Sequence, residues 1–153
     1  MHAYIFFQID PSNPALPLHY NYFIQSAIYA ALPENVASRM HDRGYSAGNR
    51  AFKMFSFSRI LGRFVINSAA GSIRFPDGAR LVISSPDTEF FLSLVNNLLT
   101  KKHIQLKNSF LNINEVRFDE QKVTDEVLLV HTLSPVVVYS TLLKPGGGKY
   151  TCY

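Results

Sequence analysis

The sequence predicts an α+β fold of the ferredoxin-like type (split βαβ, RRM-like), with an antiparallel sheet and helices on one face. Two amphipathic helical patterns, short apolar runs of strand length, and their order along the chain support this prediction. That order is strand, helix, strand, strand, helix, strand. The chain has 153 residues, of which 47% are hydrophobic, so it is long enough to bury a core without disulfides.

The first strand and helix come from the N-terminal third of the chain. Ala3–Ile9 is an apolar run of strand length, and Asp10–Pro17 holds three prolines and is predicted to be a loop. A helix follows, and its buried stripe has the i, i+3, i+4, i+7 spacing in Ile24, Ala27, Ile28 and Ala31. Leu32-Pro33 ends this helix, because a residue before proline is disfavoured in the α region.

A second, shorter helix is predicted from Pro33 to about Asp42, followed by a polar loop over Gly44–Arg50. The sequence between this loop and the next helix contains four predicted strands: Phe52–Ser58, Gly62–Ser68, Ser72–Phe75 and Ala79–Ser84. Pro76-Asp77-Gly78 is predicted to be a turn, since Pro presets φ and Gly allows a positive φ.

Ser85-Pro86 is predicted to cap and start a long helix whose apolar face includes Phe90, Leu94 and Leu98. His103–Leu106 and Phe110–Phe118 are predicted to be paired strands that complete the first domain, residues 1–123. Residues 124–153 would be a connector and the first strands of a second, truncated ferredoxin-like domain, including a strong strand at Val127–Tyr139.

Positive charge is concentrated in one part of the chain. The net charge is +4 overall, but residues 35–80 carry eight basic residues against two acidic ones, a net +6. A local positive field favours a polyanion such as RNA, and the alternative is a solvated arginine-rich surface.

Three side chains in residues 20–58 have the chemistry needed to cleave RNA at a 2′-hydroxyl. His41 lies at the end of the second predicted helix and can exchange a proton near neutral pH, since histidine has a reference pKa of about 6.5. Tyr29 lies on the polar stripe of the first helix, so we expect its hydroxyl to be exposed to solvent. Lys53 has the parity of Phe55 and Phe57 and would point to the helix-covered face, where its charge would stabilise a phosphate.

Each of these residues also has an ordinary structural interpretation: an exposed tyrosine, a surface histidine and a strand-end lysine that reaches solvent. The five histidines and the single cysteine, Cys152, show no metal-ligand spacing, so we expect no metal and no cofactor. Ser–His–Asp hydrolysis stays open, although no G-x-S-x-G motif is present. A lone cysteine and the absence of a signal-peptide pattern favour the cytoplasm, and no segment resembles a membrane span.

These motifs together resemble the CRISPR-associated repeat-cleaving endoribonucleases, the Cas-six family of the RAMP superfamily. The resemblance rests on H-Y-N-Y-F-I-Q-S-A-I-Y-A-A-L, Met40-His41, Lys53-Met54-Phe55-Ser56 and the later Thr132-Leu133-Ser134-Pro135-Val136-Val137-Val138. In that family a tyrosine of the first helix, a histidine after it and a lysine opening the next strand form the catalytic group. The matching residues are Tyr29, His41 and Lys53.

The resemblance implies cleavage of precursor CRISPR RNA without a metal, giving a 2′,3′-cyclic phosphate and a 5′-hydroxyl. CRISPR repeat RNA would be the main partner, with CRISPR effector-complex subunits and a second copy of the chain as further candidates. The family's glycine-rich loop near the C-terminus has no match here, because Gly146–Gly148 lies too early. The residues expected to contact phosphates are Arg39, Arg43, Arg50, Arg59 and Arg63.

Two alternatives to catalysis follow from the same patterns. The first is a non-cleaving RNA-binding module, since Lys53-Met54-Phe55-Ser56-Phe57 loosely resembles the stacking strand of an RNA-recognition motif. That motif belongs on the third strand, whereas this segment follows the first helical region. The second alternative is a purely structural subunit of an RNA-guided complex.

Overall fold

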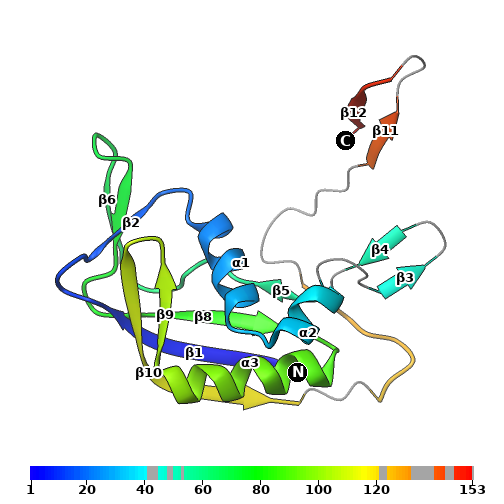
Figure 1. Cartoon of the computed structure of the whole chain (residues 1–153), viewed down its shortest axis with the longest axis horizontal. Coiled ribbons are helices and arrows are strands. Elements are labelled where there is room, and N and C mark those ends of the chain that lie inside the picture. The colour runs from blue at the N-terminus through cyan, green and yellow to red at the C-terminus, as the bar shows by residue number, and fades with distance from the viewer. Residues whose placement is uncertain are drawn as a thin grey trace. The chain divides into compact units, whose positions relative to one another are not determined.

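A five-stranded antiparallel sheet with β1 (His2–Ile9) at its centre is the main element of the computed structural model. The structure describes residues 1–40, 45–47, 50–52, 54–120, 124–131, 140–143 and 147–152. Figure 1 shows β1 flanked by its two partner strands. The strand order is β5 (Ser56–Phe57), β8 (Ala79–Ser84), β1, β10 (Ser109–Asp119) and β9 (His103–Leu106). The predicted α+β class and antiparallel sheet are confirmed.

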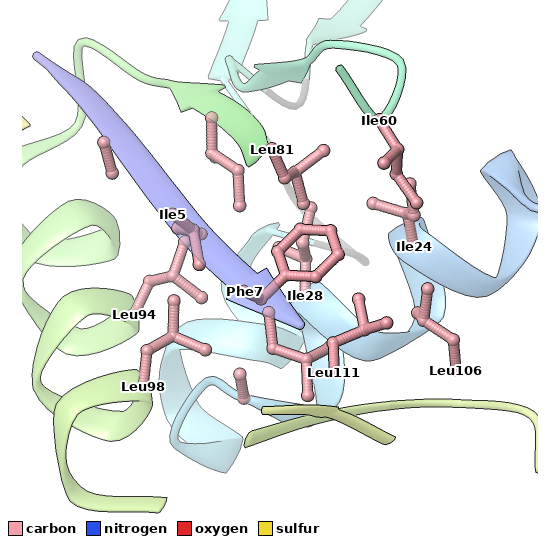
Figure 2. Close-up of a cluster of buried hydrophobic side chains, with 14 of the residues drawn as sticks. Ile5, Phe7, Ile24, Ile28, Ile60, Leu81, Leu94, Leu98, Leu106 and Leu111 are labelled. Carbon is pink, nitrogen blue, oxygen red and sulfur yellow. The ribbon is translucent and has the colours of Figure 1, made fainter. Parts of the chain in front are cut away.

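One face of this sheet is buried under two helices. Alternate residues of β1, including Ile5 and Phe7, are almost fully buried, as expected of a strand with one face in a core. Helices α1 (Asn21–Ala30) and α3 (Thr88–Lys101) supply the opposing side chains. Figure 2 shows Ile24 and Ile28 of α1 and Leu94 and Leu98 of α3 beside Ile5 and Phe7. The apolar stripes predicted for both helices therefore form the core.

Local signals set the turn at Gly78 and the end of α1. Gly78 has φ +81°, and its amide donates to the carbonyl of Phe75, so the Pro76-Asp77-Gly78 turn is confirmed. Helix α1 ends before Leu32-Pro33 as predicted, and the short α2 (Glu34–Ser38) begins directly after Pro33.

A second, three-stranded sheet was only partly predicted. It is formed by β2 (Ala15–Pro17), β7 (Ser72–Arg74) and β6 (Val65–Asn67). The prediction that all of Asp10–Pro17 is a loop is wrong at its end, because Leu16 pairs with Ile73. Ile73 lies 57 residues after Leu16 in the sequence, so no local sequence pattern predicts this strand.

The predicted strand at Phe52–Ser58 is broken into two separate pieces. β3 (Tyr45–Ala47) pairs with β4 (Arg50–Phe52) as a small hairpin, within a segment predicted to be a loop. Met54 then has φ +49°, which no extended strand allows, and β5 starts only at Ser56. The parity argument for the direction of Lys53 therefore fails, because it assumed one regular strand.

The long helix starts later than predicted. Asp87, and not Ser85, is its N-cap, and the Asp87 carboxylate accepts a hydrogen bond from the Phe90 amide at 3.0 Å. The helix ends at Lys102, which adopts the left-handed conformation with φ +56°.

The chain divides into two compact units, Met1–Gln121 and Lys122–Tyr153. In the second unit, β11 (Ser140–Leu143) and β12 (Lys149–Cys152) pair as an antiparallel hairpin. The predicted strand at Val127–Tyr139 is wrong over Val127–His131, which form no strand, and residues 132–139 lie outside the described part. The assignment of this unit to a second ferredoxin-like domain stays a prediction. Within the described residues, no helix has the length and apolar character to cross a membrane.

Candidate functional site

The turn at Ser85–Asp87, which leads into α3, is the most polar buried feature among the described residues of the first unit. Among the described residues only three polar side chains are buried, and Ser85 and Asp87 are two of them. The backbone amide of Asp87 donates to Ser85 Oγ at 3.0 Å, so the Ser85 side chain holds the turn together. Buried polar groups need such partners, because an unpaired one costs about 1–3 kcal/mol.

Asp87 also gathers side chains from two other elements. Arg39, at the end of α2, donates to Asp87 Oδ2 at 3.0 Å and also pairs with Glu89 at 3.1 Å. The hydroxyl of Tyr45 in β3 donates to the same oxygen of Asp87. The carboxylate is thus the common acceptor of a helix, a hairpin and the first turn of α3.

This arrangement shifts two pKa values. Burial, the largest influence, would raise the pKa of Asp87, but the Tyr45 hydroxyl, the Phe90 amide and the Arg39 charge together hold that pKa below its usual range. The hydrogen bond to Asp87, followed by burial, raises the pKa of Tyr45. Asp87 is therefore ionised and Tyr45 protonated at neutral pH.

Ser85 fixes the chain on the other side of the same turn. Its hydroxyl donates to the carbonyl of Met54 at 2.8 Å, at the point where Met54 has a positive φ. Arg39 and Met54 directly flank the segment 40–53. Both are hydrogen-bonded to the Ser85–Asp87 turn.

Tyr29, the candidate from α1, lies beside this region. Its ring meets Phe55 edge-on at 5.6 Å between centroids, and Phe55 in turn stacks on Phe90 of α3 at 5.1 Å. The hydroxyl oxygen of Tyr29 is buried, so the expectation that it is exposed to solvent is wrong. No sequence spacing indicates the ring contact between Tyr29 and Phe55.

An open cleft of about 440 Å³ borders the same segment. It is lined by Met54, Phe55 and Ser56 on one side and by Ser84, Ser85 and Pro86 on the other, with Met1 and His2 beside them. The Ser56 and Ser84 hydroxyls lie 2.8 Å apart across the strand pair. The cleft therefore adjoins the residues that directly follow Lys53 in the chain.

Three of the predicted site residues, His41, Arg43 and Lys53, lie outside the described residues, as does the side chain of Arg50. Of the other predicted phosphate contacts, Arg39 is bound to Asp87 and Glu89, and Arg63 pairs with Asp77 at 2.7 Å. Arg59 is exposed and pairs with no carboxylate among the described residues. Arg59 is therefore more available to a phosphate than Arg39 or Arg63.

Sequence reasoning missed Asp87 and misread Ser85. The available signal was Ser85-Pro86-Asp87 directly before an apolar helical pattern, where either polar residue could be the cap. Within the described ranges, no group of three or more His, Cys, Asp or Glu residues is placed to hold a metal ion.

Comparison with known proteins identifies one matching family model and several solved structures with a similar fold. A family model described as CRISPR-associated protein Cas6, N-terminal, matches residues 4–117. No curated protein matches the chain.

Solved structures similar to this chain cover all of it. One is described as an RAMP protein binding different RNA substrates (TM-score 0.73, 20% identity), and another as the product of a Cas6-related gene from Pyrococcus furiosus (TM-score 0.73, 21% identity). A third is described as CRISPR associated protein Cas6 (TM-score 0.64, 23% identity). This chain spans 62% of the length of each, and at these identities the likeness shows a shared fold.

Proposed function

The chain belongs to the family of CRISPR-associated protein Cas6, which its N-terminal region matches, and on this premise we propose that it cleaves precursor CRISPR RNA within the repeats. The reaction is attack of a ribose 2′-hydroxyl on the adjacent phosphate without a metal. Its products are a 2′,3′-cyclic phosphate and a 5′-hydroxyl.

The fold assignment is part of the same proposal. The strand order β5-β8-β1-β10, with α1 after β1 and α3 after β8, is the order of a split βαβ unit. We therefore assign the first unit to the ferredoxin-like class, with β9 as an added edge strand. The helices pack on the face that carries Ile5 and Phe7.

The observation that carries the proposal is the pair of contacts made by the Ser85–Asp87 turn. Arg39 and Met54 are both hydrogen-bonded to this turn. Arg39 lies two residues before His41, and Met54 directly follows Lys53. Since consecutive Cα atoms are about 3.8 Å apart, chain connectivity limits how far either side chain can lie from the turn. Tyr29 contacts Phe55, which lies two residues after Lys53 in the chain. Chain connectivity therefore also limits the distance between Lys53 and Tyr29.

The three groups divide the work of the reaction by their chemistry. His41 transfers a proton, either from the 2′-hydroxyl or to the departing 5′-oxygen. Lys53 stabilises the charge that accumulates on the phosphate. Tyr29 supports the proton transfer as a base or by hydrogen bonding. Because its hydroxyl oxygen is buried, a local opening of the packing around Tyr29 has to precede direct contact with RNA.

A second candidate function rests on that burial. A tyrosine whose hydroxyl stays covered suits a non-catalytic RNA-binding subunit of a CRISPR ribonucleoprotein complex. In that case RNA is bound through arginines such as Arg59 and leaves intact.

To test this proposal, the protein is incubated in excess chelator with RNA of the CRISPR repeat that is encoded next to its gene. A matched RNA carries a single 2′-deoxy nucleotide at the cut. We expect cleavage of the first RNA, a cyclic phosphate end, and no cleavage of the second. Binding without cleavage over long incubation supports the non-catalytic subunit, and an activity that the chelator removes contradicts the metal-free mechanism.

A further inference from the structure

A groove at the N-terminal end of α1 lies apart from the Ser85–Asp87 turn, and Arg59 is the one of its lining residues that was predicted to contact a phosphate. It encloses about 540 Å³ between α1, the Arg59–Ile60 segment and the three-stranded sheet. We call it the α1 groove. Its main lining residues are His19, Tyr22, Arg59, Phe64, Ile66 and Phe75. Its size falls within the range of about 300–1,000 Å³ that is usual for small-ligand sites.

The α1 groove exposes flat aromatic surface that the fold does not cover. Tyr22 is 72% exposed and Phe64 is 55% exposed, although both carry large aromatic rings. Single exposed apolar residues are common, but here they line one hollow together with Ile66, which is 48% exposed.

Both exposed rings are supported from behind by a second ring. Tyr22 meets Phe23 edge-on at 5.7 Å, and Phe64 packs at 6.3 Å against Phe75, which is buried. These contacts restrict the orientations of the two rings before any ligand binds. A ligand that stacks on them consequently loses less affinity to side-chain ordering.

The charge at the groove selects an anionic ligand. Arg39, Arg63 and Arg117 each pair with a carboxylate, whereas Arg59 has no such partner in the part of the chain that the structure describes. An unpaired guanidinium beside exposed aromatic rings matches a nucleotide, which offers a flat base and a phosphate together. An apolar protein segment would use the rings and leave Arg59 without a partner.

We propose that the α1 groove binds an unpaired nucleotide of an RNA strand, its base stacked on Phe64 or Tyr22 and its phosphate on Arg59. The choice of RNA as the ligand rests on the proposed function. Tyr22 and Tyr29 are seven residues apart on α1, so they share a face and lie about 10 Å apart along its axis. A strand held in the groove is thus adjacent to the helix that carries the candidate tyrosine.

The test measures binding of two fluorescent 12-mers by anisotropy at fixed salt. One is 2′-O-methyl oligouridylate, which has no 2′-hydroxyl and cannot be cleaved, and the other is an abasic strand of equal charge. Phe64→Ala is expected to weaken uridylate binding about 5- to 150-fold, the effect of losing one base–aromatic stack, and to leave abasic binding unchanged. Arg59→Ala is expected to weaken both and to reduce the slope of log K against log salt by about 0.7.

Phe118→Ala is the matched control, because Phe118 is 68% exposed on β10 and is not a lining residue of the groove. It should change neither affinity, and the melting temperature of each variant shows that the fold is kept. Tyr22→Ala is measured in the same way, because either ring could hold the base. Equal losses for both probes in these two variants, or no loss of uridylate binding in either variant, would overturn the proposal. Loss of self-association in Phe64→Ala with unchanged RNA binding would instead make the groove a contact between copies of the chain. Since the uridylate cannot be cleaved, failure of the cleavage proposal does not affect this result.

Discussion

The buried Asp87 carboxylate makes hydrogen bonds to residues from three different parts of the first unit. It caps α3, accepts from Tyr45 and pairs with Arg39, so one carboxylate links α3 to β3 and to the end of α2. We infer that Asp87 positions the segment 40–53, which carries His41 and Lys53, and does not itself touch RNA. Ser85 completes this role by binding the Met54 carbonyl.

The charge of Asp87 should stabilise the fold only while the carboxyl is ionised. Because its pKa is lower in the folded state, the stabilisation is present above the usual aspartate pKa of about 3.9 and is lost as pH falls through the folded value. Asp87→Asn keeps a good N-cap but removes the charge, so we expect a loss of about 1–3 kcal/mol at pH 7.

Thermal unfolding between pH 2 and pH 7 checks this prediction. The difference between Asp87→Asn and the wild type should shrink as the pH drops below about 3.9. Asp77→Asn is the control, because Asp77 pairs with Arg63 at an exposed site and such pairs contribute little. A difference in stability that does not depend on pH would show that the charge of Asp87 is unimportant.

At the scale of helices and strands, the sequence predicted correctly those features that depend on residues close together in the chain. The apolar stripe of α1 and its end before Leu32-Pro33 were correct, because spacing and proline geometry act within a few residues. The break at Met54 was not predictable, since its strained backbone is held by a hydrogen bond to Ser85, 31 residues away. The same holds for β2, which exists only through its pairing with β7.

The C-terminal end of α3 offers a direct test of one such local rule. Lys102 has φ +56°, a conformation that costs about 1–2 kcal/mol for a residue with a side chain, so Lys102→Gly is expected to stabilise the protein. The melting temperature should rise by about 2–4 °C for each kcal/mol gained. Lys101→Gly, one residue earlier and still helical, should lower stability by about 0.5–1 kcal/mol. A loss of stability in Lys102→Gly would contradict the assigned cap.

For the first unit as a whole, the fold brings together residues that are distant in the sequence. Tyr29, Phe55 and Phe90 form one aromatic cluster. Arg39 and Met54 are joined beside it through hydrogen bonds to Asp87 and Ser85. The sequence identified Tyr29 as a candidate and predicted a helix cap at Ser85. It did not indicate that Arg39 and Met54 bind to this turn, because the chemistry of a cap does not reveal what else binds to it. The burial of the Tyr29 hydroxyl likewise comes from tertiary packing and could not be read from the polar stripe.

The central claim is that Tyr29, His41 and Lys53 act on one ribose–phosphate linkage, and its most direct test is the single-turnover cleavage rate of His41→Ala on repeat RNA. The account predicts a loss of about 10²–10⁴-fold, the effect of removing one general acid–base group, with RNA affinity unchanged. His103→Ala, which changes an exposed histidine on β9, should cleave at the wild-type rate. A His41→Ala protein that cleaves the repeat as fast as the wild type would contradict the account.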